Sequence, residues 1–252
     1  PKSIERLKAA GKEVVVSTLS LLHTEKEEQY TKDLIEHYDG LVEVNDVSAL
    51  QLLAGKPHCI GPYVNIYNEM AMDFHVNNGA IRVALPFELP GRSIQAIASK
   101  TQVEVEIQVF GRTPLAISAR CAHARAYNKK RKGCQYICDR DPNGMEAATL
   151  DHAPFLVLNG LQTMSSAYCN LLGEIDALQK MQVNVFRLSP HDVDMLKVCA
   201  LYRGVIDHRL SVDQAQAELE AVIHPAKSAN GFFHNESGCH FVRNQHEREA
   251  VE

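Results

Sequence analysis

Three cysteines on one short polar stretch are the residues of this chain best suited to chemistry. Cys121, Cys134 and Cys138 are spaced C-x12-C-x3-C, and Gly133 precedes the second of them. Thiolates gathered on a flexible loop select zinc or an iron–sulfur cluster. A structural zinc site usually shows two close pairs of ligands, and only one close pair occurs here. The residues alone leave two interpretations open, a metal or cluster site and three ordinary cysteines that behave as small hydrophobic side chains.

The same stretch is strongly basic. Its cations start at residue 120, and no carboxylate follows until Asp139. A four-iron cluster on four thiolates carries about two negative charges, which nearby cations would stabilise. A solvated loop and a docking patch for RNA or an acidic partner are equally compatible with the charge pattern. The cations are Arg120, Arg125, Lys129, Lys130, Arg131 and Lys132.

The other cysteines and the histidines give weaker signals. Cys59 lies inside a strand-like run and Cys199 lies on an apolar helical stripe, so both are predicted to be core residues. We do not expect Cys169 or Cys239 to be ligands. His123, close behind the first cysteine of the cluster, is expected to be a loop residue rather than a ligand.

No arrangement for hydrolysis is found in the sequence. The motifs G-x-S-x-G and H-E-x-x-H are absent, and no base is placed near Ser118. We therefore assign no catalytic residue.

Composition bounds the class of protein. The 252 residues are 45% hydrophobic and 23% charged, which is typical of a globular chain with a sizeable core. Lys and Arg total 26 against 31 for Asp and Glu, so the net charge of −5 provides no overall field for nucleic acid. The odd number of cysteines, seven, and the missing secretory signal favour a reducing compartment and predict a cytoplasmic protein. The longest strongly apolar stretch, residues 14–22, is about half of the ~20 residues that span a bilayer.

Strand-like apolar runs alternate with helix-like segments, which is the pattern of βα units and a parallel sheet. The predicted strands are Val14–Leu19, Leu41–Val44, His58–Val64, Ile81–Leu85, Val103–Phe110, Phe155–Leu158 and Val183–Leu188. The predicted helices are Ser3–Ala10, Glu25–Tyr38, Val47–Leu53, Asn68–Asn77, Arg92–Ser99, Cys169–Lys180, His191–Tyr202 and Ser211–Val222.

These elements favour a barrel over a doubly wound sheet, because no Gly-rich phosphate loop is present. We predict an α/β fold, a TIM-type (β/α)8 barrel over residues 1–190 with a cysteine-containing loop at about 118–140. Only seven of the eight strands are found, so the first strand unit is expected to precede Pro1. Residues 191–252 are predicted to form C-terminal helices and a loop that pack on the barrel.

Several polar residues follow predicted strands, where the functional side chains of barrels gather. Asn65, Tyr67 and Asn68 come after the third strand, and Glu88 comes after the fourth. Helix capping by Asn68 and a solvated Glu88 are the simpler interpretation. Glu106 interrupts an apolar strand and is expected to point into the barrel, where it needs Arg120 or another donor.

The segment from Glu106 to Cys121, together with the two later cysteines, resembles the signature of the collagenase-like peptidase family U32. Most members of that family carry His where Phe110 stands and a further Cys where Pro114 stands. Pro at this position is similar to the family branch called UbiV, and so are the stretches at residues 155–164 and 187–190. The similarity runs from about residue 2 to about residue 235.

The resemblance implies a TIM-type barrel and an oxygen-sensitive 4Fe-4S cluster, with Cys121, Cys134 and Cys138 matching three of its iron ligands. It implies a fourth ligand in a segment upstream of Pro1. The role it implies is oxygen-independent hydroxylation of prenylated aromatic precursors in anaerobic ubiquinone biosynthesis. The implied partners are a UbiU-like sister subunit, forming a heterodimer, and a lipid-binding accessory protein.

Three other functions stay open. A family peptidase is disfavoured by the missing nucleophile and zinc motifs. RNA hydroxylation, found in other branches of the family, fits the basic loop but not the net charge. A scaffolding subunit that only supports its partner is not distinguished by sequence.

Overall fold

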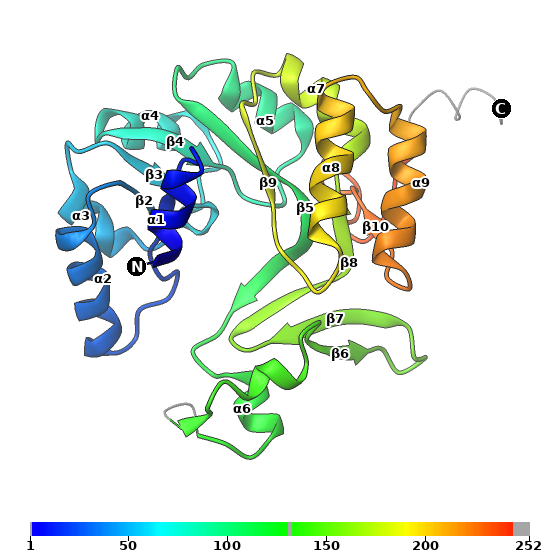
Figure 1. Cartoon of the computed structure of the whole chain (residues 1–252), viewed down its shortest axis with the longest axis horizontal. Helices are drawn as coiled ribbons and strands as arrows, with labels where there is room; N and C mark the ends of the chain where they lie inside the picture. The colour runs from blue at the N-terminus through cyan, green and yellow to red at the C-terminus, as the bar shows by residue number, and fades with distance from the viewer. Residues whose placement is uncertain (1, 131–132, 244–252) are drawn as a thin grey trace. The chain divides into compact units, whose positions relative to one another are not determined.

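The structure, a computed structural model, describes residues 2–130 and 133–243 (Figure 1). The chain divides into two compact units. The described part of the first comprises residues 2–86 and 93–106, and that of the second comprises residues 87–92, 107–130 and 133–243. The long strand β5 (Glu104–Ile117) begins in the first unit and continues in the second.

The first unit is built from parallel βα repeats. Strands β1, β2, β3, β4 and the start of β5 pair in that order, and all pairs are parallel. Its elements are α1 (Lys2–Ala9), β1 (Val15–Ser17), α2 (Glu25–His37), β2 (Leu41–Val44), η1 (Val47–Ala49), α3 (Leu50–Leu53), β3 (His58–Ile60), η2 (Pro62–Val64), α4 (Glu69–Asn77), β4 (Ala80–Ala84) and most of α5 (Gly91–Ala98).

Local chemistry explains where these helices begin. Thr24 accepts the backbone N–H of Glu27 at the start of α2, and Asn68 accepts that of Ala71 at the start of α4. Each side chain pairs an amide that the helix itself leaves without a partner. The capping role expected for Asn68 is therefore confirmed.

The second unit is different, because its main ladder is antiparallel. Strand β5 pairs with β8, β8 with β7, and β7 with β6, all antiparallel. Strand β9 also pairs with β5, and β10 pairs with β8 in parallel. Its elements are α6 (Ala122–Ala126), η4 (Ile137–Arg140), β6 (Met145–Ala148), β7 (Pro154–Asn159), β8 (Gln162–Asn170), η5 (Leu172–Glu174), α7 (Ile175–Lys180), β9 (Val185–Leu188), α8 (Met195–Ile206), α9 (Val212–Ile223) and β10 (Ser228–Ala229).

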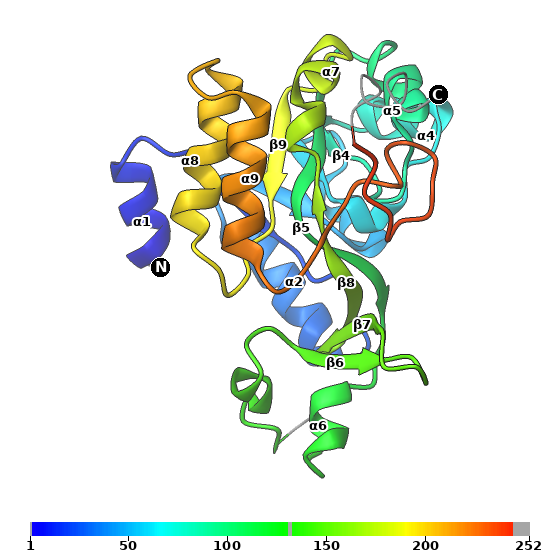
Figure 2. The same ribbon diagram turned by 90° about the vertical axis from the view of Figure 1, so that its right-hand side faces the viewer.

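A buried polar network ties the helices of the second unit to its strands. Asn170 is 1% exposed and donates to Oγ of Ser228 and to Oε1 of Gln216, both over 3.0 Å. The Tyr202 hydroxyl donates to the carbonyl of Val109 over 2.7 Å. Each of these polar groups has a hydrogen-bond partner. The network therefore fixes α8, α9 and β10 against β5 and β8. Helices α8 and α9 lie side by side in both views (Figure 2).

The mixed α/β fold is as predicted, but a closed (β/α)8 barrel is not confirmed. In the part of the chain that the structure describes, the strand order runs from β1 to β6 and only its first half is parallel. Phe155–Leu158 was expected to be a barrel strand and instead lies in the antiparallel β6–β7–β8 sheet. The predicted helix Cys169–Lys180 was wrong at its start, because Cys169 and Asn170 complete β8. The division at residue 190 stays a prediction.

Candidate functional site

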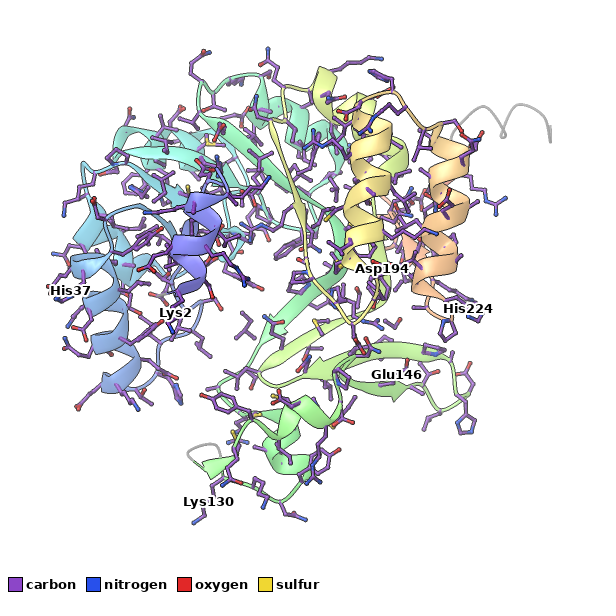
Figure 3. All side chains as sticks on the ribbon, in the orientation of Figure 1. Lys2, His37, Lys130, Glu146, Asp194 and His224 are labelled. Atoms are coloured by element: carbon purple, nitrogen blue, oxygen red, sulfur yellow. The ribbon has the colours of Figure 1, made fainter. Side chains whose placement is uncertain are left out.

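The described residues 118–130 and 133–141 are called the thiol segment below, and the start of this segment is bonded to the tip of the β7–β8 hairpin. Ser118 donates its backbone N–H to the carbonyl of Leu161, and Ala122 donates to that of Gly160, both over 2.9 Å. Figure 1 shows α6 beyond β6 and β7, at the end of the β5–β8 ladder. Figure 3 shows Lys130 projecting from this segment away from Glu146 of β6. The hairpin tip therefore positions the residues on either side of Cys121.

A buried histidine organises the segment. His123 is fully buried, its Nδ1 accepts the N–H of Gly160 over 3.0 Å, and its Nε2 lies 3.2 Å from Oδ2 of Asp141. The Tyr127 hydroxyl donates to the same carboxylate oxygen over 2.9 Å. The expectation that His123 is an ordinary loop residue was wrong, because the small α6 places its ring inside the segment.

All three thiols of the segment are partly exposed, and none forms a disulfide. Cys121 precedes α6, and its Sγ accepts the N–H of Ala124 over 3.4 Å. Amide donors of this kind stabilise thiolates that bind metal. Three free thiols on one segment fit the donor chemistry of an iron–sulfur cluster. Among the residues described, however, no three His, Cys, Asp or Glu side chains are grouped to hold a metal ion, so ligation by Cys121, Cys134 and Cys138 stays a prediction.

The charge around these thiols is exposed. Each cation of the basic stretch that the structure describes is exposed, and so is Tyr136 at 78%. The Arg140 guanidinium lies over the ring of Tyr127, 5.7 Å from its centroid. Arg131 and Lys132 lie outside the described residues. The described cations of the prediction are Arg120, Arg125, Lys129 and Lys130.

A second group of polar side chains lies on one face of the parallel sheet in the first unit. Cross-strand partners run from Ser17 to Glu43, from Glu43 to Cys59, from Cys59 to Arg82 and from Arg82 to Glu104. Ser17 donates to Glu43 over 3.0 Å, and Arg82 is paired with Glu104 at 2.6 Å. Alternating side chains share a face of a strand, so these five form one row across the sheet. We call them the polar row.

Beyond the polar row, Asn45, which follows β2, closely approaches Gly61, which follows β3. Asn45 is 6% exposed and donates Nδ2 to Oε1 of Glu43 over 2.9 Å, while its Oδ1 has no partner. A Cβ on Gly61 would overlap this Oδ1 atom. Glu106 lies two residues after Glu104 on β5, pairs with Ala84 of β4 and is 7% exposed. Glu106 is therefore buried, and the expectation that Arg120 or another donor serves its carboxylate stays a prediction.

The remaining candidate residues divide between core and surface. Cys59 is 1% exposed, as predicted, and burial raises the pKa of its thiol to about 11. Cys199 was predicted to be a core residue and is exposed, because it lies on the open side of α8. Asn65 adopts a left-handed conformation after η2 and, like Glu88, is exposed.

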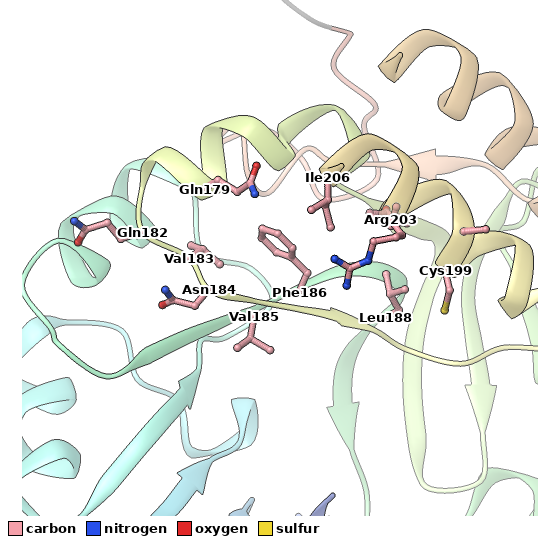
Figure 4. A pocket seen from close by; sticks show the side chains of 12 residues that line it. Gln179, Gln182, Val183, Asn184, Val185, Phe186, Leu188, Cys199, Arg203 and Ile206 are labelled. Atoms are coloured by element: carbon pink, nitrogen blue, oxygen red, sulfur yellow. The ribbon is translucent and has the colours of Figure 1, made fainter. Parts of the chain in front are cut away.

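Cys199 lines a groove of about 910 Å³ between α8 and β9 (Figure 4). Arg203 and Phe186 line the same groove. Nη1 of Arg203 lies 3.8 Å from Oδ1 of Asp207, so its charge has a partner. The Arg203 side chain is 65% exposed, and Cys199 is the only thiol that lines the groove, with no other cysteine among the lining residues. We therefore place the candidate chemistry in the thiol segment.

The chain belongs to peptidase family U32, whose profile matches residues 1–242. The chain is similar to the tRNA hydroxylation protein P1 of Bacillus subtilis (strain 168), with 25% identity over 236 residues. The alignment covers 82% of this chain and 52% of that protein, so the chain spans about half the length of the relative. A solved structure, that of the U32 peptidase Mk0906, aligns over 76% of this chain and 75% of that one with a TM-score of 0.42 and 14% identity. No helix in the described residues is long and apolar enough to cross a membrane.

Proposed function

We propose that this chain is an iron–sulfur subunit of an oxygen-independent hydroxylation system. The observation that carries the proposal is the thiol segment, with three free cysteines anchored to a hairpin through the buried His123. In this proposal Cys121, Cys134 and Cys138 hold three irons of a 4Fe-4S cluster, which supplies one-electron chemistry when bound. The name of the relative from Bacillus subtilis supports hydroxylation as the reaction class.

The substrate that we propose is a prenylated aromatic precursor of ubiquinone, with a UbiU-like sister subunit and a lipid-binding accessory protein as partners. The Pro114 position and the surrounding UbiV-like residues support this branch. The protein's own contribution at the segment is electrostatic and geometric. Exposed cations around the thiols would offset the negative charge of the cluster, and the amide donor to Cys121 would favour its thiolate.

A second candidate is hydroxylation of tRNA. The printed function of the relative favours it, and so do the exposed cations and the exposed Tyr136 of the thiol segment, since cationic and aromatic side chains bind single-stranded RNA. Proteolysis is not proposed, because no nucleophile and base pair was found among the sequence motifs.

The deciding experiment is complementation in anaerobically grown cells that lack this protein. Wild-type chain and the variant with Cys121, Cys134 and Cys138 all changed to Ser are compared, with Cys199→Ser as the thiol control. Hydroxylated quinone precursors and hydroxylated tRNA nucleosides are both measured by mass spectrometry. The proposal predicts that only the triple variant loses the quinone products. If the triple variant loses the hydroxylated tRNA nucleosides and keeps the quinone products, the second candidate is supported. If the triple variant keeps both kinds of product, both candidates are overturned.

A further inference from the structure

Four cations of the thiol segment are exposed and lack a carboxylate partner in the described part of the chain. No Asp or Glu among the described residues lies within ion-pair distance of any of them. The segment therefore leaves positive charge available to a partner molecule. The four side chains, called the basic patch, are Arg120, Arg125, Lys129 and Lys130.

Charge is divided unevenly between this segment and the rest of the chain. The described part of the thiol segment holds five Lys or Arg side chains against two Asp, and one of these, Asp141, is already bound by His123 and by the Tyr127 hydroxyl. The chain outside residues 118–141 holds 19 Lys or Arg against 29 Asp or Glu, a net charge of −10. An acidic partner is therefore attracted by the basic patch and repelled by the rest of the chain, which restricts where it docks.

An exposed aromatic side chain lies on the same segment. Tyr136 is placed between Cys134 and Cys138 and is 78% exposed. Gln135 and Tyr136 have φ angles of 52° and 55°, in the left-handed region that residues other than glycine rarely adopt. The backbone N–H of Ile137 donates to the carbonyl of Cys134 over 3.2 Å and closes this turn. Tyr and Arg side chains contribute most at protein interfaces, so Tyr136 is the expected anchor for a protein partner.

These features favour an acidic protein over a nucleic acid. Single-stranded RNA binds along a row of cations that offers several aromatic rings for stacking. Residues 118–141 contain only two Tyr and no Phe or Trp, and the Arg140 guanidinium lies over the ring of Tyr127, 5.7 Å from its centroid. A long polyanion would also extend beyond the segment and meet the negative charge of the rest of the chain. A small protein can contact the segment alone.

The three thiols of the segment indicate what kind of acidic protein would dock there. Cys121, Cys134 and Cys138 are partly exposed and share the segment with the basic patch. In the proposed function they hold a one-electron group, which must exchange electrons with a carrier. Complexes between redox proteins have small interfaces, and electrostatic attraction between the partners speeds their encounter.

We propose that the basic patch and Tyr136 dock a small acidic one-electron carrier protein, which delivers electrons to the hydroxylation system. The inference rests on the proposed function. In each encounter one electron leaves the reduced carrier and is taken up by the iron–sulfur group, so the carrier is oxidised, the group is reduced and no covalent bond changes. Docking itself needs only side chains of the segment, so it can be measured without iron.

The test is calorimetric titration of the whole 252-residue chain, prepared without iron, with an oxidised 2Fe-2S ferredoxin as the acidic carrier. Ferredoxin should bind at about 20 mM salt and at least about tenfold more weakly at about 200 mM, because salt screens exposed charges. The reconstituted chain should bind it more weakly but with the same dependence on salt, since a cluster offsets part of the positive charge.

Two lysine pairs give a matched comparison. Lys129→Gln combined with Lys130→Gln should weaken ferredoxin binding about fivefold at low salt, because both cations belong to the basic patch. Lys26→Gln combined with Lys32→Gln removes two exposed cations from α2 and should change nothing. Tyr136→Asn removes the ring, keeps a residue that tolerates the left-handed conformation, and should also weaken binding about fivefold.

Reduction kinetics provide a second measurement. The reconstituted chain is mixed with reduced ferredoxin or with dithionite, and the loss of visible absorbance is followed. The variant at Lys129 and Lys130 should be reduced about fivefold more slowly by ferredoxin and at an unchanged rate by dithionite, because only the protein reductant needs the basic patch.

The inference is contradicted if ferredoxin does not bind the iron-free chain at low salt, or if it binds both lysine variants equally well. An oligouridylate of about 12 nucleotides is the RNA probe. If its binding is lost in the variant at Lys129 and Lys130 while ferredoxin binding is kept, the patch is an RNA site and the inference is overturned. Ferredoxin binding by a chain that takes up no iron on reconstitution contradicts the proposed function alone. Normal iron uptake without ferredoxin binding contradicts this inference alone.

Discussion

The backbone N–H of Gly160 donates to Nδ1 of His123 over 3.0 Å, although the two residues lie 37 positions apart in the chain. This bond joins the β7–β8 hairpin to the thiol segment. It explains how a polar, cysteine-bearing stretch with a single short α-helix keeps a defined place in the fold. The buried ring thus adds to the Ser118 and Ala122 backbone bonds that join α6 to the hairpin.

His123→Leu should loosen the thiol segment. The substitution leaves the buried Gly160 amide without its acceptor, which costs about 1–3 kcal/mol, while Asp141 keeps the Tyr127 hydroxyl as a partner. Hydrogen exchange of the peptides covering α6 and Gly160 should accelerate, while exchange in α2 stays unchanged. His37→Leu, at an exposed site on α2, is the control. Unchanged exchange at α6 in the His123 variant would show that the ring does not hold the segment.

Gly61→Ala should destabilise the first unit through contact with Asn45 alone. The φ angle of Gly61 is −82°, which alanine adopts freely, so backbone strain does not contribute. The new Cβ overlaps Oδ1 of Asn45, and the expected loss in the free energy of unfolding is about 1–3 kcal/mol. Urea denaturation measures it. Gly133→Ala, where no atom lies within 4 Å of the added carbon, should be near neutral.

Cysteine labelling should separate the thiols by burial. The pKa of the Cys59 thiol is raised to about 11, chiefly by burial, with Arg82 lowering it and Glu43 and Glu106 contributing to the rise. At pH 8 only about one thiol in a thousand is then ionised, and the side chain is also inaccessible. Iodoacetamide should modify the exposed Cys199 within minutes and leave Cys59 intact until the protein unfolds. Rapid modification of Cys59 under native conditions would contradict the burial of this thiol within the polar row.

His191 should make stability depend on pH. Its pKa is lowered from about 6.5 to about 4, so the folded state binds fewer protons than the unfolded state between these values. The stability that the neutral ring contributes is complete above pH 6.5 and is lost as pH falls toward 4. His191→Gln, which cannot be protonated there, should flatten this part of the curve. A variant with the wild-type pH dependence would exclude His191 as its source.

Much of the first unit could be predicted from sequence, because each parallel strand is a short apolar run bounded by a helix with polar caps. Glu25–His37 and Glu69–Asn77 were found almost to the residue, as their caps Thr24 and Asn68 are ordinary helix starts. The burial of Glu106 was also expected from the way it interrupts an apolar strand.

The second unit was less predictable, because two of its strands, β6 and β8, lack a clear apolar run. Strand β8 (Gln162–Asn170) contains few large apolar residues, and β6, which pairs with β7, is only four residues long. The Asn159-Gly160 dipeptide was the available signal for the hairpin, since such pairs favour tight two-residue turns. The backbone N–H of Arg112 donates to Nε2 of His191, which lies 79 positions further along the chain. No local sequence signal could predict this contact.

The site was predicted in type but not in arrangement. The cysteine spacing identified the thiol segment, whereas the burial of His123 depends on the distant Gly160 and Asp141. Cys199 was misplaced because helical periodicity identifies an apolar stripe but not whether another element covers it.

The central claim is most directly tested by iron and acid-labile sulfide analysis of anaerobically reconstituted protein. The account predicts that wild-type chain binds both and shows broad visible absorbance bleached by dithionite. Single changes of Cys121, Cys134 or Cys138 to Ser should each reduce the bound iron severalfold, while Cys199→Ser and Cys239→Ser leave it unchanged. A wild-type chain without iron or sulfide after reconstitution, or equal iron in all five variants, would contradict the account.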